Sequence, residues 1–141
     1  MSWNSTIEKI YNRYGETLIS KGFIRLDCGA YRMVYQRKGI VIKVPINEDG
    51  IFDNMIEDAA WHIHKSKPTR DGYYLAPCRI LRNKCLMMVT VDVESNGELP
   101  DWASDIDGCQ VGIYKNEFVA YDYAINVEVP RYLVQKYIGY F

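Results

Sequence analysis

"GIVIKVPINEDG", residues 39–50, is a short aliphatic run with a lysine at its centre. Lys43 stands between Ile42 and Val44, and Pro45 closes the run. A strand alternates its side chains between two faces, so Lys43 points away from the face that its two neighbours share. Two interpretations remain open for this lysine. It lies on the solvent-exposed face of a sheet, or it is placed to bind a phosphate.

The overall composition is that of an ordinary globular chain. Its 141 residues are 48% hydrophobic and 25% charged, which predicts one domain over residues 1–141. A net charge of −1 argues against a non-specific nucleic-acid binder. We find no apolar run long enough for a membrane span and no secretory leader, so we expect a cytoplasmic protein. The four cysteines form no CxxC pair and are interpreted as reduced thiols.

The first half of the chain predicts a helix, three strands and a second helix. The first helix spans residues 4–20, with Ser5 and Glu8 at capping-box spacing and Ile10 in its apolar stripe. Strands follow at 23–29, 31–38 and 39–45, with a tight turn at Lys38-Gly39. The segment "NEDG", 47–50, is interpreted as a break before a helix over 51–66.

The second helix has a broad apolar face that includes Phe52 and Ile63. Asn54, Glu57 and Trp61 lie roughly opposite that face. We therefore expect these three residues either in solvent or on a second stripe that looks into a cleft.

The second half predicts two further strand pairs. Residues 73–81 and 84–93 pair around Arg82-Asn83, and residues 109–115 and 118–124 pair around Asn116. A short helix follows Pro130. The expected fold class is α+β, with a largely antiparallel sheet.

Several residues of chemical interest occur in a fixed order along these elements. "DCGAYRMVY", 27–35, places Gly29 five residues before Val34 in a strand-turn-strand segment. Lys43 follows on the next strand, and Glu57 lies in the helix after it. Beyond the apolar strand at 84–93 come "DIDGCQ", 105–110, and a last apolar strand that ends at Asp122.

This series resembles the protein-kinase family over about residues 22–125. Aligned on Val34, the phosphate loop G-x-G-x-x-G-x-V places Gly29 at its middle glycine, with Asp27 and Arg32 at the other two. Lys43 in "VIKV" matches the strand lysine of V-A-I-K. The resemblance implies the small kinase lobe: an antiparallel sheet with one αC-like helix, flanked here by an N-terminal and a short C-terminal helix.

The resemblance also implies a nucleotide site. Gly29 would approach the phosphates of ATP, Lys43 would bind the α and β phosphates, and Glu57 would hold the lysine in place. The strand at 84–93 would lead to the hinge, where adenine hydrogen-bonds to backbone.

The catalytic and metal positions follow in the last third of the chain. Asp105 and Gln110 have the spacing of Asp and Asn in H-R-D-L-x-x-x-N, and Asp107 competes with Asp105 for the role of base. Asp122, at the start of "DYA", matches the Asp of D-F-G. Asp122 and Gln110 would then hold Mg²⁺ if the protein is active.

The sequence also departs from the family. Two of the three glycines and the His-Arg of the catalytic loop are absent, and only 17 residues follow "DYA". We therefore expect a degenerate, pseudokinase-like module that acts mainly by binding a partner protein and retains nucleotide binding at most. Small compact proteins of this kind are often encoded by phages, so we expect a phage-encoded protein directed at a host factor. Two alternatives stay open: a minimal ATP-dependent phosphotransferase, and an α+β interaction domain with an accidental resemblance. The oligomeric state is not indicated.

Overall fold

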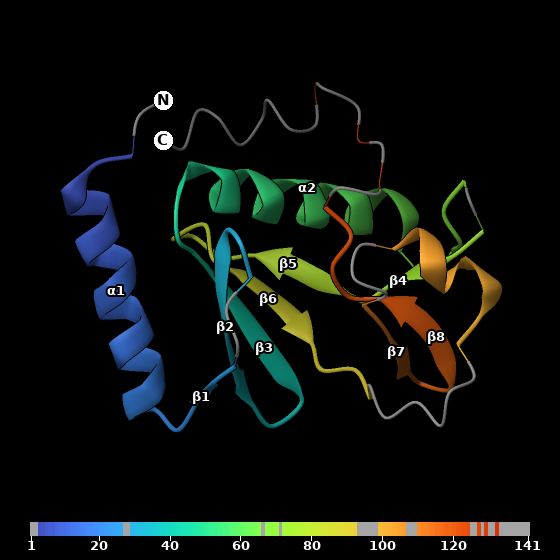
Figure 1. Cartoon of the computed structure of the whole chain (residues 1–141), viewed down its shortest axis with the longest axis horizontal. Coiled ribbons are helices and arrows are strands. Elements are labelled where there is room, and N and C mark those ends of the chain that lie inside the picture. Colours follow the sequence, from blue (N-terminus) through green and yellow to red (C-terminus); the bar gives the residue numbers. More distant parts are fainter. Residues whose placement is uncertain are drawn as a thin grey trace.

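The structure is a computed structural model of the whole chain, shown in Figure 1. It describes residues 3–26, 29–65, 67–70, 72–92, 99–106, 110–124, 127, 129 and 132. Two helices pack against a five-stranded antiparallel sheet, and a three-stranded sheet lies beside it. The predicted α+β class is thus confirmed. Among the described residues, no helix combines the length and apolarity that a bilayer crossing requires.

Helix α1 (Ser5–Ser20) lies against the β1 and β2 side of the larger sheet (Figure 1). Its N-cap is Asn4, whose side-chain oxygen accepts a hydrogen bond from Ile7 N at 2.9 Å. The predicted cap at Ser5 is wrong by one residue, because an asparagine in extended conformation reaches the third helical N–H equally well. Ile10, predicted in the apolar stripe, is 56% exposed, whereas Tyr11 and Leu18 are buried.

The larger sheet has the strand order β1-β2-β3-β6-β5. Its strands are β1 (Ile24–Arg25), β2 (Arg32–Arg37), β3 (Ile40–Pro45), β5 (Cys78–Ile80) and β6 (Leu86–Val89). The predicted turn between β2 and β3 is confirmed, since Arg37 faces Ile40 across the hairpin. Lys38 and Gly39 both have positive φ, as a two-residue hairpin of this kind requires. The first strand is much shorter than predicted, with two residues in the sheet.

Helix α2 (Glu48–His64) begins three residues earlier than predicted. The Asn47 side chain accepts a hydrogen bond from Gly50 N at 3.0 Å, so "NEDG" caps and opens the helix instead of breaking the pattern. Glu48 and Asp49 in the first turn favour this start through the helix dipole. At Gly50 a side chain would collide with the carbonyl of Tyr31, so glycine permits the close approach of the helix to the β2–β3 region.

The smaller sheet has the order β4-β8-β7. It contains β4 (Tyr74–Leu75), β7 (Val111–Tyr114) and β8 (Glu117–Ala120). The predicted pairing of the last two strands is confirmed, with Lys115 and Asn116 in the turn. The single strand predicted over 73–81 is wrong. Pro77 lacks an N–H and separates β4, which pairs in parallel with β8, from β5, which pairs with β6.

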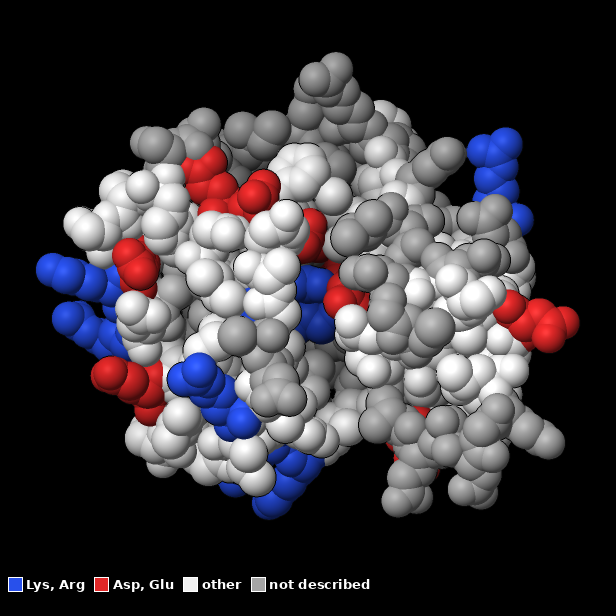
Figure 2. All heavy atoms as spheres, viewed as in Figure 1, with Lys and Arg blue, Asp and Glu red and all other residues white. Residues whose placement is uncertain are grey.

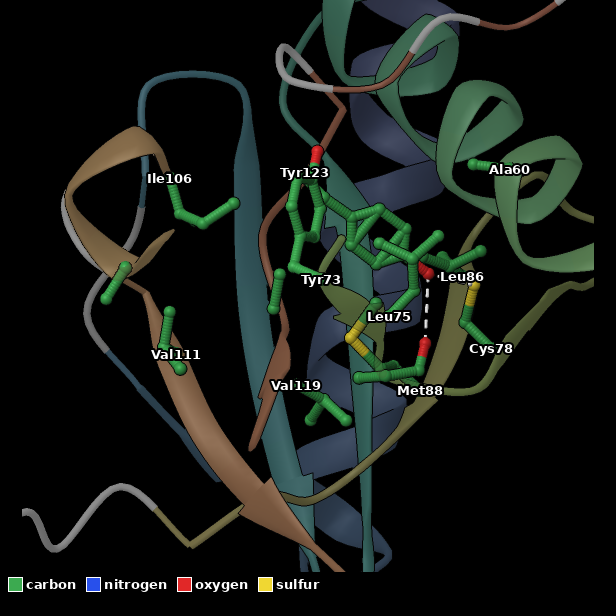
Figure 3. Packing of buried hydrophobic residues seen from close by; sticks show 13 residues of the cluster. Ala60, Tyr73, Leu75, Cys78, Leu86, Met88, Ile106, Val111, Val119 and Tyr123 are labelled. Carbon is green, nitrogen blue, oxygen red and sulfur yellow. Dashed lines mark hydrogen bonds between the residues drawn. The ribbon is translucent and has the colours of Figure 1, made fainter. Parts of the chain in front are cut away.

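Two apolar clusters hold these elements together. The first lies between α1, α2 and the larger sheet and includes Leu18, Ile42 and Met55. The second joins the two sheets beneath α2 (Figure 3). In that figure, side chains from β4, β6, β7 and β8 converge; they include Leu75, Leu86, Val111 and Val119. A continuous apolar core therefore fixes the position of the smaller sheet against the larger one. The helix predicted after Pro130 lies outside the described residues.

Between Val89 and the smaller sheet, a short 3₁₀ helix, η1 (Asp101–Asp105), adds to the second cluster. Trp102 in this helix stacks on Tyr73, with ring centroids 5.3 Å apart. The segment that the sequence placed at the catalytic loop thus begins as part of the core packing.

Candidate functional site

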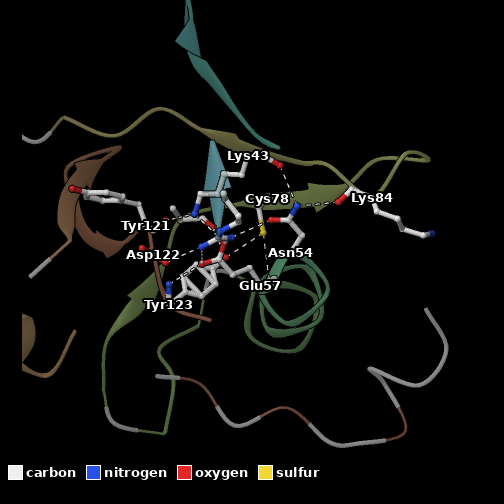
Figure 4. Close-up of polar contacts among 10 residues, drawn as sticks. Lys43, Asn54, Glu57, Cys78, Lys84, Tyr121, Asp122 and Tyr123 are labelled. Carbon is white, nitrogen blue, oxygen red and sulfur yellow. Dashed lines mark hydrogen bonds and ion pairs between the residues drawn. The ribbon is translucent and has the colours of Figure 1, made fainter. Parts of the chain in front are cut away.

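The site is built on a buried polar face of α2 (Figure 4). Asn54 and Glu57 are both 0% exposed, while Phe52 and Ile63 of the predicted apolar face are exposed. The prediction that Phe52 and Ile63 face the core is therefore wrong. Of the two alternatives left open for Asn54 and Glu57, the solvent-exposed one is excluded, because both side chains face the protein interior. A buried carboxylate needs compensating charge and hydrogen bonds, and both come from neighbouring strands.

Lys43 on β3 supplies one of these charges. Its Nζ lies 2.9 Å from Glu57 Oε1 and donates a second hydrogen bond to the carbonyl of Tyr121 at 2.6 Å. The lysine is 5% exposed, so it does not lie on a solvent-exposed sheet face. The contact between Lys43 and Glu57 that the sequence analysis anticipated is therefore present.

Arg32 at the start of β2 supplies the second charge, and sequence reasoning missed it. Its Nη1 lies 2.5 Å from Glu57 Oε1, and its Nη2 lies 2.8 Å from Asp122 Oδ1. Arg32 was noted only as the residue at the third glycine position of the phosphate loop. A signal was available, because Val34 pairs with Lys43 and strand alternation puts Arg32 on the same face as Val34.

Asn54 and the backbone of Tyr123 complete the network around Glu57. The Asn54 side chain accepts from Arg32 Nη1 at 3.1 Å and donates to the carbonyls of Lys43 and Lys84. Tyr123 N donates to Glu57 Oε2 at 2.8 Å. One carboxylate thus joins β2, β3, α2 and the segment after β8, which are far apart in the sequence.

The pKa values of these groups follow from burial and pairing. Burial by itself disfavours the charged form of Glu57, but Arg32 and Lys43 outweigh it and lower the pKa of Glu57 to about 2. Burial also opposes the charge of Arg32, yet the Glu57 and Asp122 carboxylates leave its pKa raised. For Lys43, burial is the largest effect and lowers the pKa, while Glu57 opposes that shift.

Beside this network lies a cleft of about 660 Å³. Its volume is in the range of small-molecule sites. The charged wall includes Arg32, Lys43, Asp53 and Asp122. The apolar wall comes from strands β2, β3 and β6 and from the segment after β6; it includes Val34, Val41, Met88, Val89 and Val91.

Asp53 is a second site residue that the sequence analysis did not single out. It precedes Asn54 on α2 and lines the same cleft as Arg32 and Asp122. Burial raises its pKa to about 6, with Arg32 opposing the rise and Glu57 and Asp122 adding to it.

The predicted site residues divide into two groups. Gly29, Lys43, Gln110 and Asp122 all line the cleft, and Glu57 contacts the cleft lysine. The structure describes neither the Asp105 side chain nor any part of Asp107, so their predicted catalytic role stays a prediction.

Gly29 lines the cleft with its N–H already engaged. That group donates to the carbonyl of Arg32 at 3.0 Å, which closes a turn. A side chain at Gly29 would meet only ordinary van der Waals contact, with the Arg32 carbonyl at 3.8 Å. In this conformation the turn therefore uses the Gly29 N–H, which is not free to bind a phosphate.

The described residues present no preformed magnesium site. Mg²⁺ takes carboxylate oxygens at about 2.0–2.1 Å in near-octahedral geometry. The Asp122 carboxylate instead pairs with the Arg32 guanidinium, and the described residues contain no group of three His, Cys, Asp or Glu side chains that could hold a metal ion.

Figure 2 shows charged side chains of both signs interspersed over one face, with blue and red groups adjoining near its centre. Comparison of the chain with protein-family models, with curated proteins and with solved structures gave no match.

Proposed function

We propose that this chain is a kinase-like module whose cleft binds a nucleotide, and that it acts by binding a partner protein and not by transferring a phosphoryl group. One observation carries the proposal: Lys43, held by Glu57 at 2.9 Å, lines a cleft beside an apolar surface that includes its strand partner Val34. A planar base and an anionic tail require these two surfaces side by side.

The apolar wall provides for the base. Val34 and Val41 lie on adjacent strands, and Met88 lies opposite Val41 in the sheet register. Thr90, at the end of this wall, has a hydroxyl oxygen that is buried and has no hydrogen-bond partner among the described residues. An unpaired buried polar atom costs free energy, so a base that pairs with this hydroxyl after the Thr90 side chain rotates toward the cleft would gain affinity.

The charged wall favours binding over transfer. The Asp122 carboxylate, which would carry the metal in a kinase, is committed to Arg32. Phosphoryl transfer depends on metal ions that neutralise the developing charge, and this pairing competes with them. The output is then a surface or conformation that a partner protein recognises. Exposed Ile24 and Leu26, at the edge of the larger sheet, offer apolar contact area for such a partner.

Calorimetric titration with ADP and ATP tests the proposal. We expect binding to the wild type, and a loss of about tenfold or more for Lys43→Met, since removal of the cation leaves the carboxylates in excess beside the phosphate. An exposed-lysine variant, Lys9→Met on α1, serves as the matched control. Absence of binding at millimolar nucleotide would show that the proposed function is wrong.

A minimal phosphotransferase remains the second candidate. Gln110 and Asp122 both line the cleft that contains Lys43, which is the observation in its favour. Release of phosphate from ATP, or autophosphorylation, that is lost in both Lys43→Met and Asp122→Asn would make it the leading function.

A further inference from the structure

We propose that the cleft binds its nucleotide without a divalent cation, because the Arg32 guanidinium pairs with Asp122, the carboxylate that a metal would need. This inference rests on the proposed nucleotide binding and specifies its chemistry. It is carried by the geometry of Arg32 and by the charge balance of the cleft.

Several hydrogen bonds hold the Arg32 side chain firmly in place. Its two terminal nitrogens donate to Asn54, to both carboxylate oxygens of Glu57 and to Asp122, at distances between 2.5 and 3.4 Å. The side chain is 8% exposed. A guanidinium is charged at every physiological pH and matches carboxylates through two parallel N–H groups. Arg32 is therefore a permanent, oriented cation of the site.

A metal ion at Asp122 would have to displace Arg32. Mg²⁺ on Asp122 would bring two further positive charges next to Arg32 and near Lys43, both of which are buried. Arg32 would then have to leave Asp122 while it stays attached to Glu57 and Asn54. Elsewhere in the described residues, no group of three acidic, histidine or cysteine side chains could take the ion instead.

The charged groups of the cleft include both cations and anions. Arg32 and Lys43 contribute two positive charges, and Glu57 and Asp122 contribute two negative charges in direct contact with them. Asp53 on the same wall has a pKa of about 6 and adds a third negative charge at neutral pH, so without a metal the charged wall carries a net charge of about −1. Affinity then comes mainly from the apolar wall, and each added phosphate of the ligand contributes little. We expect AMP, ADP and ATP to bind with dissociation constants within about tenfold of one another.

The decisive experiment compares ADP titrations of the wild type in excess EDTA and in millimolar MgCl₂. We expect the two dissociation constants to agree within about threefold. Binding that appears only with Mg²⁺, or that strengthens tenfold or more, would overturn the metal-free inference and leave the proposed function intact. Absence of binding in both buffers would overturn both.

Asp122→Asn gives a test of opposite sign. In a metal site this substitution removes a ligand of the ion and weakens Mg-nucleotide binding. In the arrangement proposed here it releases Arg32 from a carboxylate and removes one negative charge from the cleft, so ADP in EDTA should bind several-fold more tightly. A tenfold loss of affinity in Asp122→Asn would contradict the inference. Because Asp122 is 30% exposed, we expect the variant to fold, and circular dichroism checks this.

Arg32→Gly restores the third glycine of the loop motif and is the converse test. It frees Asp122, so Mg²⁺ should now strengthen ADP binding by tenfold or more. A folded Arg32→Gly variant that stays indifferent to Mg²⁺ would contradict the role given to Arg32. If the variant does not fold, the sign of the Asp122→Asn effect still decides.

Discussion

The two walls of the cleft differ in how completely their groups are satisfied. On the charged wall, Glu57 accepts from Arg32, Lys43 and the backbone of Tyr123. On the apolar wall, Val41 and Val91 line open volume, and the Thr90 hydroxyl has no partner among the described residues. The charged wall therefore stabilises the fold, whereas the apolar wall is available to contact a ligand. A buried charge pair beside a cleft can therefore be more important for stability than for catalysis.

Glu57→Gln should break the charged wall and have the largest effect. The amide leaves Arg32 and Lys43 buried without their shared countercharge, so the free energy of unfolding should fall by about 3–5 kcal/mol. Urea denaturation measures this. The control is Glu117→Gln on the exposed start of β8, which should change stability by less than about 0.5 kcal/mol. Equal effects at the two positions would show that the network does not stabilise the fold.

Asn54→Ala should weaken the same wall by less. It removes the acceptor of Arg32 and leaves the carbonyls of Lys43 and Lys84 without this donor. A loss of about 1–3 kcal/mol in unfolding free energy is expected. Asn12→Ala, on the exposed side of α1, is the matched control. A loss below that of the control would mean that water replaces the amide without penalty.

Val41→Phe tests the apolar wall separately. The larger ring should fill the space assigned to the base and reduce ADP affinity by about tenfold or more, which is about 1.4 kcal/mol. Because the ring enters open volume, the unfolding free energy should change by less than it does in Glu57→Gln. Ile10→Phe, on the exposed face of α1, should leave affinity unchanged. Unaltered binding in Val41→Phe would show that the ligand does not bind at this wall.

Asp53 should produce the smallest effect, a pH dependence. Its pKa is about 6 in the fold against 3.8 as the ordinary value, so the folded state binds more protons between these values. Stability should therefore fall as the pH rises from about 4 to about 6. Asp53→Asn should flatten this slope in thermal melts, and Asp101→Asn should not.

Glu57 acts in the opposite direction and at lower pH. Because its pKa is lowered from 4.5 to about 2, its contribution to stability is complete above 4.5 and is lost as the pH falls towards 2. A wild type whose stability rises between pH 4 and 6 would contradict the environment assigned to Asp53.

Local patterns predicted most of the elements. Alternating apolar residues and turn dipeptides located the β2–β3 and β7–β8 hairpins, because these signals act between neighbours. They failed where a local signal had two meanings. "NEDG" has turn composition, yet Asn47 uses it to cap α2. Apolar periodicity placed Phe52 inside, but the polar face of α2 is the one that the network buries.

For the site, the sequence by itself placed Lys43 in an apolar strand and Glu57 in the helix that follows, and the resemblance to the kinase lobe predicted that the two would meet. Only the tertiary structure decided what surrounds them. Arg32 and Asp122 are 90 residues apart, and no periodicity relates them. They pair because the second apolar cluster docks the β8 end beside β2. That docking brings Asp122 to Arg32, and this contact decides whether the cleft favours a metal ion or binds phosphate without one.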